Sequence, residues 1–198
     1  MPHLKHEKLC LAPVAGVDEA GRGPLAGPVV AAAVILPAKG IPRGLDDSKK
    51  LTAATRATLH DRLMDCAMVG VGICEAEEID SLNILWATMK AMTLAVEALG
   101  CDPGHVLVDG NRLPRWSYAG TAIVKGDTIS LSIAAASIVA KHRRDTIMIA
   151  HADAYPHYGW HANKGYGAPD HLRALREHGP CPLHRRSFAP VAQMVLSI

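Results

Sequence analysis

The chain has 198 residues, of which 49% are hydrophobic and 20% are charged, and its formal net charge is +2. This length and composition suffice for one substantial core, so we expect residues 1–198 to form a single domain. The nearly balanced charge excludes a protein that binds polyanions through overall basicity, so any affinity for nucleic acid must come from local clusters.

The cysteines and the apolar stretches limit the compartment. The five cysteines are scattered, odd in number and without a C-x-x-C pair, which argues against a disulfide framework or a zinc knuckle. Residues 1–8 contain no apolar run of signal-peptide length. The longest apolar stretches, 28–37 and 129–140, are shorter than the roughly 20 residues that span a bilayer. We therefore expect a cytoplasmic protein with no membrane association.

The first part of the chain predicts two strands, a helix and a third strand. Residues 14–18 and 29–36 are short apolar runs separated by a turn rich in glycine and proline at 21–28. Residues 52–64 have helical spacing of their leucines, and 69–74 again have strand character.

The middle of the chain holds the clearest helix and two short strands. Apolar side chains return to one face over residues 85–99, and Gly100 stands where a C-terminal cap is expected. Residues 105–109 and 121–124 are short apolar strands, and an acidic residue ends or closely follows each of them.

The last part of the chain predicts helices. Residues 130–151 read as one long helix, small and apolar at first and charged later, and a shorter amphipathic helix covers 169–178. The segment between them, 157–167, is predicted to be a loop dense in glycine, aromatic and basic residues. The apolar tail, 190–198, is expected to pack against the protein.

Adjacent carboxylates at the end of an apolar strand are the first chemical signal. Asp18 and Glu19 end the first predicted strand. Two neighbouring anions in a partly desolvated place repel each other unless a cation compensates, and oxygen donors suit a hard ion such as Mg²⁺ or Mn²⁺. Taken alone, however, such a pair is more often part of a solvated turn.

Two further acids change this balance. Asp109 ends one predicted strand and Asp127 follows another, so a single sheet could bring four carboxylates to one edge. A convergent carboxylate cluster holds two metal ions about 4 Å apart in enzymes that hydrolyse phosphodiesters. The sequence therefore predicts Asp18, Glu19, Asp109 and Asp127 as catalytic metal ligands.

Other motifs in the sequence are incidental. The glycine spacing from Gly16 lacks the lysine and hydroxyl residue of a phosphate-binding loop, and Pro24 and Pro28 interrupt a dinucleotide-binding pattern. The histidines fit no zinc spacing, and the lone C-x-x-H of Cys181 and His184 lacks two further ligands. We interpret these histidines as structural or solvated.

Motifs along almost the whole chain resemble the ribonuclease HII family. The motifs are D-E-A-G-R-G-P-L-A-G-P-V at 18–29, D-S-K-K-L at 47–51, N-I-L-x-A-T at 83–88, V-D-G-N at 108–111, K-G-D at 125–127, S-I-A-A-A-S-I at 132–138, K-G-Y-G at 164–167 and H-R-R-S-F at 184–188. The chain departs from the family pattern at Trp160 and Asn163, where phenylalanine and histidine are expected.

The resemblance implies an α/β protein of the ribonuclease H-like fold, with a mixed central sheet flanked by helices and a helical C-terminal part. It also implies a monomeric endoribonuclease that uses Mg²⁺ or Mn²⁺. The implied substrates are the RNA strand of RNA–DNA hybrids and single ribonucleotides in duplex DNA, cut to leave 5′-phosphate and 3′-hydroxyl ends.

The resemblance assigns roles by matching positions. Asp18, Glu19, Asp109 and Asp127 would be the metal-binding catalytic acids. The turn of Gly21, Arg22 and Gly23 would approach the ribose 2′-hydroxyl through its backbone, and Tyr166 would pack on the sugar at the junction.

Phosphate binding is assigned on weaker grounds. Ser48 and Lys49 are expected to hold phosphates, with Lys125, Lys141 and Arg144 as further candidates, although surface lysines are usually only solvated. Asp145 is expected to form an ion pair rather than bind metal.

Two other functions share these features. A hybrid-binding protein without catalysis would need no complete set of acids, and a DNA-only nuclease or resolvase would need no sensor of the 2′-hydroxyl.

Overall fold

A computed structural model describes residues 1–195, which build a five-stranded mixed sheet with the strand order β3-β2-β1-β4-β5. The strands are β1 (Val14–Ala20), β2 (Val29–Ile35), β3 (Met68–Cys74), β4 (His105–Asp109) and β5 (Gly120–Ile123). β2 pairs antiparallel with both β1 and β3, whereas β1, β4 and β5 run parallel. The predicted mixed sheet is therefore confirmed.

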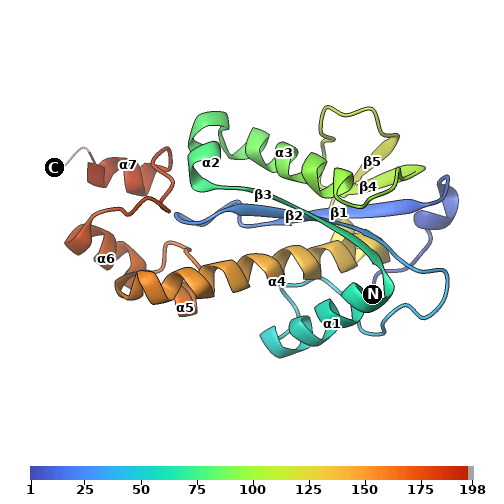
Figure 1. The fold of residues 1–198 in the computed structure, drawn as a ribbon, viewed down its shortest axis with the longest axis horizontal. Coiled ribbons are helices and arrows are strands. Elements are labelled where there is room, and N and C mark those ends of the chain that lie inside the picture. The colour runs from blue at the N-terminus through green and yellow to red at the C-terminus, as the bar shows by residue number, and fades with distance from the viewer. Residues whose placement is uncertain (196–198) are drawn as a thin grey trace.

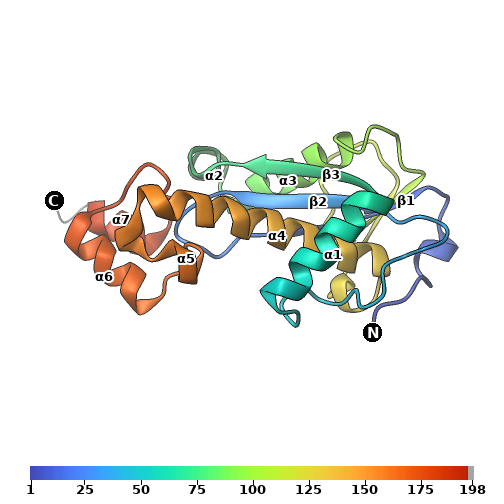
Figure 2. The ribbon, with the colours of Figure 1, turned by 60° about the horizontal axis from the view of Figure 1, so that its bottom comes forward.

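Helices cover both faces of this sheet (Figures 1 and 2). The helices are α1 (Ala53–Cys66), α2 (Ala76–Leu82), α3 (Ile84–Glu97), α4 (Leu131–Ala154), α5 (Trp160–Asn163), α6 (Pro169–His178) and α7 (Ala189–Val195), with short 3-10 turns η1 (Glu7–Leu9), η2 (Gly126–Thr128) and η3 (Pro156–Tyr158). β2 is buried on both sides, because Ala31 and Ala33 pack in the core under α3 while Ala32 and Val34 pack in the core under α1 and α4. This double burial explains its uninterrupted apolar sequence.

Two glycines let helices lie directly on strands. A Cβ atom on Gly16 would stand 2.1 Å from the backbone of Ser132 in α4, and one on Gly72 would stand 2.0 Å from the carbonyl oxygen of Ala91 in α3. Only a residue without a side chain permits this approach. α4 is thereby held against β1, the strand that carries Asp18 and Glu19.

The C-terminal helices form a third core around the far end of α4 (Figure 1). The prediction of an open loop at 157–167 is wrong, because this segment contains η3 and α5 and buries Tyr158 and Trp160. Met148 and Ala152 of α4 belong to the same core. The predicted helical C-terminal part is confirmed, and aromatic side chains supply much of its packing.

Several boundaries differ from the prediction. β1 continues two residues beyond Asp18, to Ala20, and α2 was not predicted at all. α3 ends at Glu97 with Ala98 as its cap, so the assignment of Gly100 as the cap is wrong. α7 covers the first part of the predicted tail, with Val191 fully buried, and residues 196–198 lie outside the described part of the chain.

Within residues 1–195, no helix combines the length and hydrophobicity needed to cross a bilayer. α4 is long, but it carries charged side chains from Lys141 onward.

Candidate active site

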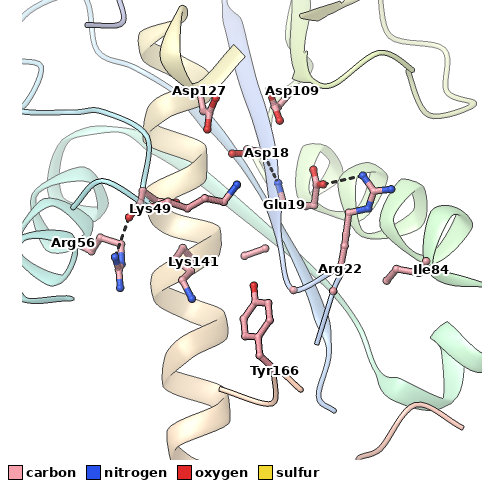
Figure 3. A pocket seen from close by; sticks show the side chains of 14 residues that line it. Asp18, Glu19, Arg22, Lys49, Arg56, Ile84, Asp109, Asp127, Lys141 and Tyr166 are labelled. Carbon is pink, nitrogen blue, oxygen red and sulfur yellow. Dashed lines mark hydrogen bonds and ion pairs between the residues drawn. The ribbon is translucent and has the colours of Figure 1, made fainter. Parts of the chain in front are cut away.

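The carboxylates predicted as metal ligands gather where parallel strands end. Val17 of β1 pairs with Val108 of the parallel strand β4. The next residues of the two strands, Asp18 and Asp109, therefore lie side by side at the same edge of the sheet. Asp127 lies in η2, just after β5. Figure 3 shows Asp18, Asp109 and Asp127 together at one end of a cleft, whereas the carboxylate of Glu19 points to Arg22.

The cleft has a volume of about 800 Å³ and is lined by the four predicted metal ligands, the turn 21–23, Ser48, Lys49 and Tyr166. Its lining comprises Asp18, Glu19, Ala20, Gly21, Arg22, Gly23, Ser48, Lys49, Arg56, Ile84, Asp109, Asp127, Lys141 and Tyr166. These residues come from β1 and the turn after it, the loop before α1, the helices α1, α3 and α4, the end of β4, η2 and the segment after α5. The fold therefore brings residues that are far apart in the sequence into a single site.

Burial and mutual repulsion disfavour the charged forms of three acids. Desolvation, reinforced by Glu19 and Asp109, raises the pKa of Asp18 well above its ordinary value. Desolvation also raises the pKa of Glu19, against the opposing effect of Arg22, whose guanidinium lies 3.3 Å from its carboxylate. The pKa of Asp127 is raised by desolvation and by Asp109. The end of the cleft where Asp18, Asp109 and Asp127 lie together therefore concentrates negative charge that a cation would relieve.

Among residues 1–195, no group of three or more His, Cys, Asp or Glu side chains is arranged closely enough, as the side chains stand, to hold a metal ion. The donor set of the cleft nevertheless suits a hard divalent cation, because it consists of carboxylate oxygens that repel one another. The Glu19 side chain is 13% exposed and pairs with Arg22, so its carboxylate would have to turn away from that guanidinium to bind the same ion as the aspartates.

Basic and hydroxyl groups line the wall beside the acids. Ser48 and Lys49 reach the cleft from the loop before α1, and the backbone nitrogen of Ser48 donates to Ser137 Oγ on α4 at 3.3 Å. Arg56, which sequence reasoning missed, donates to the carbonyl oxygens of Ser48 and Leu51 at 2.9 and 2.6 Å. No sequence pattern singles it out, because it is one polar residue on an amphipathic helix.

The glycine turn and Tyr166 close the other end of the cleft. An ideal Cβ atom on Gly23 would lie 3.8 Å from Cε1 of Tyr166, so a side chain at this position would contact the ring, and glycine leaves that space open. The hydroxyl of Tyr166 points toward the acids in Figure 3.

Arg144 and Lys125 do not take part in the cleft, contrary to their suggested role as phosphate ligands. Arg144 is fully buried, and its guanidinium donates to the carbonyl oxygens of Pro28, Ala26 and Lys164. Lys125 is exposed and does not line the cleft. Asp145 forms the expected ion pairs, with Lys141 at 2.6 Å and Arg56 at 3.5 Å.

A mixed sheet of this order, covered by helices on both faces and carrying an acidic cleft at one edge, defines the class of ribonuclease H-like nucleases. The sequence model of the family "Ribonuclease HII" matches residues 15–191. The chain therefore belongs to the ribonuclease HII family, and it is a ribonuclease H that acts on the RNA of RNA–DNA hybrids.

Named relatives agree with this assignment. The chain is 62% identical to a ribonuclease HII of Rhizorhabdus wittichii over 93% of this chain and 91% of that protein. Its fold is similar to that of ribonuclease H2 from Pyrococcus horikoshii, with a TM-score of 0.79 and 27% identity over 93% and 97% of the two chains. It also resembles the structure of Bst-RNase HIII in complex with Mn²⁺, with a TM-score of 0.70 and 21% identity over 93% and 69%.

Proposed function

We propose that the chain hydrolyses the RNA strand of RNA–DNA hybrids, and cuts at single ribonucleotides in duplex DNA, by a two-metal-ion mechanism. In this mechanism a water oxygen bonds to phosphorus while the bond to the preceding 3′ oxygen breaks. The products carry a 5′-phosphate and a 3′-hydroxyl end. Asp18, Glu19, Asp109 and Asp127 would hold Mg²⁺ or Mn²⁺.

The observation that carries this proposal is the crowding of four acids in one cleft, of which Asp18 is buried and the other three are partly buried. Asp18 is 6% exposed, and Glu19, Asp109 and Asp127 each raise its pKa by repulsion. A pair of divalent ions supplies an activated water and stabilises the leaving oxygen. The Mn²⁺ complex of the structurally similar ribonuclease HIII supports Mn²⁺ as one usable ion.

Discrimination of ribose from deoxyribose would rest on the turn 21–23 and on Tyr166. The 2′-hydroxyl is the group by which the two sugars differ, so a sensor must approach it closely. Gly23 leaves its backbone open toward the cleft, and the ring of Tyr166 lies where a side chain at position 23 would contact it. A sugar with a 2′-hydroxyl would hydrogen-bond to the turn while Tyr166 packs on its neighbour.

Substrate phosphates would be held by Ser48 and Lys49. Both line the cleft, and Lys49 is close enough to Asp127 to oppose the rise of its pKa. A cation there attracts the phosphate backbone without reading sequence.

One experiment tests the substrate assignment. The protein is incubated with Mg²⁺ and duplex DNA that carries one ribonucleotide, beside an all-DNA duplex of the same sequence. We expect cleavage of the first duplex alone, at the ribonucleotide. Equal cleavage of both duplexes would instead establish a DNA nuclease, and binding of a hybrid without cleavage would establish a catalytically inactive binding protein.

We also propose a single-domain monomer that works in a reducing compartment such as the cytoplasm. α4 contributes to the core under the sheet and to the C-terminal core, which supports one folding unit, and all five cysteines are free. Light scattering should give the mass of one chain, and thermal unfolding should show one transition.

A further inference from the structure

The turn 21–23 and the Tyr166 loop are held in place by buried residues that do not line the cleft. Arg185 is fully buried, and its guanidinium donates to the carbonyl oxygens of Gly21 at 2.6 Å and Arg22 at 3.0 Å. It also donates to the carbonyl oxygens of Gly27 and Pro28, at 2.9 and 3.1 Å. One side chain thus fixes the beginning and the end of the segment 21–28, whose residues 21–23 line the cleft.

His171 holds the Tyr166 loop through a hydrogen bond to its backbone. Its Nδ1 atom lies 2.8 Å from the carbonyl oxygen of Tyr166, and because a carbonyl only accepts, Nδ1 must carry the proton. The Nε2 atom of a neutral His171 is then an acceptor, and the indole nitrogen of Trp160 donates to it at 3.3 Å.

The neighbouring histidine completes this arrangement. His184 Nε2 lies 3.0 Å from His171 Nε2, so it must be the donor of the pair. Its Nδ1 atom is left to accept from the backbone nitrogen of Cys181 at 3.1 Å. Burial lowers the pKa of both imidazoles, to about 3 for His184, which agrees with two neutral rings of fixed tautomer.

Arg144 connects the turn that Arg185 holds with the loop that His171 holds. It donates to the carbonyl oxygen of Lys164, at the start of the Tyr166 loop, and to those of Ala26 and Pro28, behind the glycine turn. The backbone nitrogen of Leu25 donates to the carbonyl oxygen of Gly165 at 2.8 Å. Turn and loop are therefore linked through buried hydrogen bonds that would be costly to break.

We propose that His171 and Arg185 are positioning residues of the ribose site: they hold the Tyr166 loop and the turn 21–23 at one separation, and thereby set the preference for a ribonucleotide. This inference rests on the proposed function. The separation matters because a single carbon atom added to Gly23 would already contact the Tyr166 ring, and a misplacement of about 1 Å can reduce a rate about 100-fold.

Two substitutions at His171 separate positioning from stability. His171→Phe keeps a ring among Tyr158 and Trp160 but removes the donor to Tyr166. His171→Asn places an amide nitrogen where Nδ1 stood, so the bond to Tyr166 is kept while the partners of Nε2 are lost. A purely structural role would make the asparagine variant at least as defective as the phenylalanine variant.

Arg185→Lys tests the other anchor. Lysine keeps the positive charge but cannot reach the carbonyl oxygens of Gly21, Arg22, Gly27 and Pro28 together. The matched control is Arg186→Lys, because Arg186 is the exposed neighbour and its side chain is not part of the network.

The readout is KM and kcat on duplex DNA with one ribonucleotide, together with the cleavage ratio to an all-DNA duplex. We expect about a tenfold or larger rise in KM and a lower ratio for His171→Phe and Arg185→Lys, with smaller effects on kcat. His171→Asn and Arg186→Lys should stay near the wild-type values even if His171→Asn melts earlier.

Folded His171→Phe and Arg185→Lys variants with wild-type KM and ratio would overturn the inference, as would an asparagine variant as impaired as the phenylalanine one. If the variants do not fold, nitrogen-15 NMR of the wild-type imidazoles decides, since an Nδ1-protonated His171 is required and the opposite tautomer refutes the arrangement. Equal cutting of both duplexes by the wild type would instead refute the proposed function itself.

Discussion

The Oδ1 atom of Asp109 accepts a hydrogen bond of 2.7 Å from the backbone nitrogen of Gly126, the residue that precedes Asp127. The acid that ends β4 is thereby tied to the turn that carries another acid of the cleft. One hydrogen bond thus fixes the relative position of two proposed metal ligands, one at the end of β4 and one in η2.

This relationship makes Asp109→Asn an informative variant. An asparagine Oδ1 atom can still accept from Gly126, so the turn should keep its place while one negative charge is lost. We expect Mg²⁺-dependent cleavage to fall by at least about 100-fold, since a metal ion contributes several kcal/mol to the transition state. Hybrid binding should remain near the wild-type level in a gel-shift assay, and undiminished cleavage would refute the metal-ligand assignment.

Asp18→Asn should stabilise the metal-free protein while it abolishes cleavage. Asp18 is buried among like charges that raise its pKa, so a neutral side chain removes desolvation and repulsion together. Thermal melting in EDTA should show a higher midpoint, by about 2–4 °C for each kcal/mol relieved in a chain of this size. A lower midpoint would show that Asp18 carries a stabilising contact rather than strain.

Gly23→Ala and Gly21→Ala should separate activity from folding. A methyl group on Gly23 meets only Tyr166, at 3.8 Å, so the fold should be unaffected while the space for the ribose narrows. A methyl group on Gly21, where φ is +96°, would stand 2.0 Å from Arg144 Nε. We expect Gly21→Ala to lose about 1–3 kcal/mol in urea unfolding and Gly23→Ala to lose mainly cleavage. Full activity of Gly23→Ala would argue against the turn as a sensor.

Lys49→Ala should weaken substrate binding in a salt-dependent way. Loss of one phosphate contact lowers the slope of log affinity against log salt concentration by about 1. The control is Lys50→Ala, since Lys50 pairs with Asp46 and does not line the cleft. Fluorescence anisotropy with a labelled hybrid at several salt concentrations measures both slopes, and equal slopes for the two variants would remove Lys49 from the interface.

His184→Phe should reduce the loss of folding stability as the pH falls below neutrality. Burial lowers the pKa of His184 from its ordinary value of 6.5 to about 3. Between these two pH values the imidazole is protonated in the unfolded chain but neutral in the folded protein. Stability is therefore complete above pH 6.5 and is lost as the pH falls toward 3, by up to about 1.4 kcal/mol per pH unit. Urea unfolding between pH 4 and 7 should show a smaller slope for the variant, and an unchanged slope would contradict this assignment.

Local patterns were sufficient to locate the strands and the acids. A short apolar run that ends in a carboxylate predicts a strand and places the carboxylate at the end of that strand. β4 has the predicted bounds, His105–Asp109. The motif with Asp18 and Glu19 is specific because few backbones require two adjacent acids followed by a segment, 21–27, in which three of seven residues are glycine. These features depend on neighbours in the chain, which the sequence displays directly.

Burial of polar and aromatic side chains was not visible in the sequence. Arg144 reads as a surface residue of a charged helix end, yet three backbone carbonyls from two distant segments surround it. Trp160 and Asn163 read as departures in an open loop, yet one donates to His171 and the other holds Tyr158 and Gly165. Their partners lie far along the chain or across a tight turn.

The sequence by itself determined the family, the order of the strands along the chain, and the residue types available for phosphodiester chemistry. The tertiary structure alone decided that Asp18, Asp109 and Asp127 share one cleft with Tyr166, and that Arg185 and His171 support it from behind. The physical reason is that secondary structure follows from local periodicity, whereas desolvation and hydrogen-bond partners depend on which distant segments the fold brings into contact.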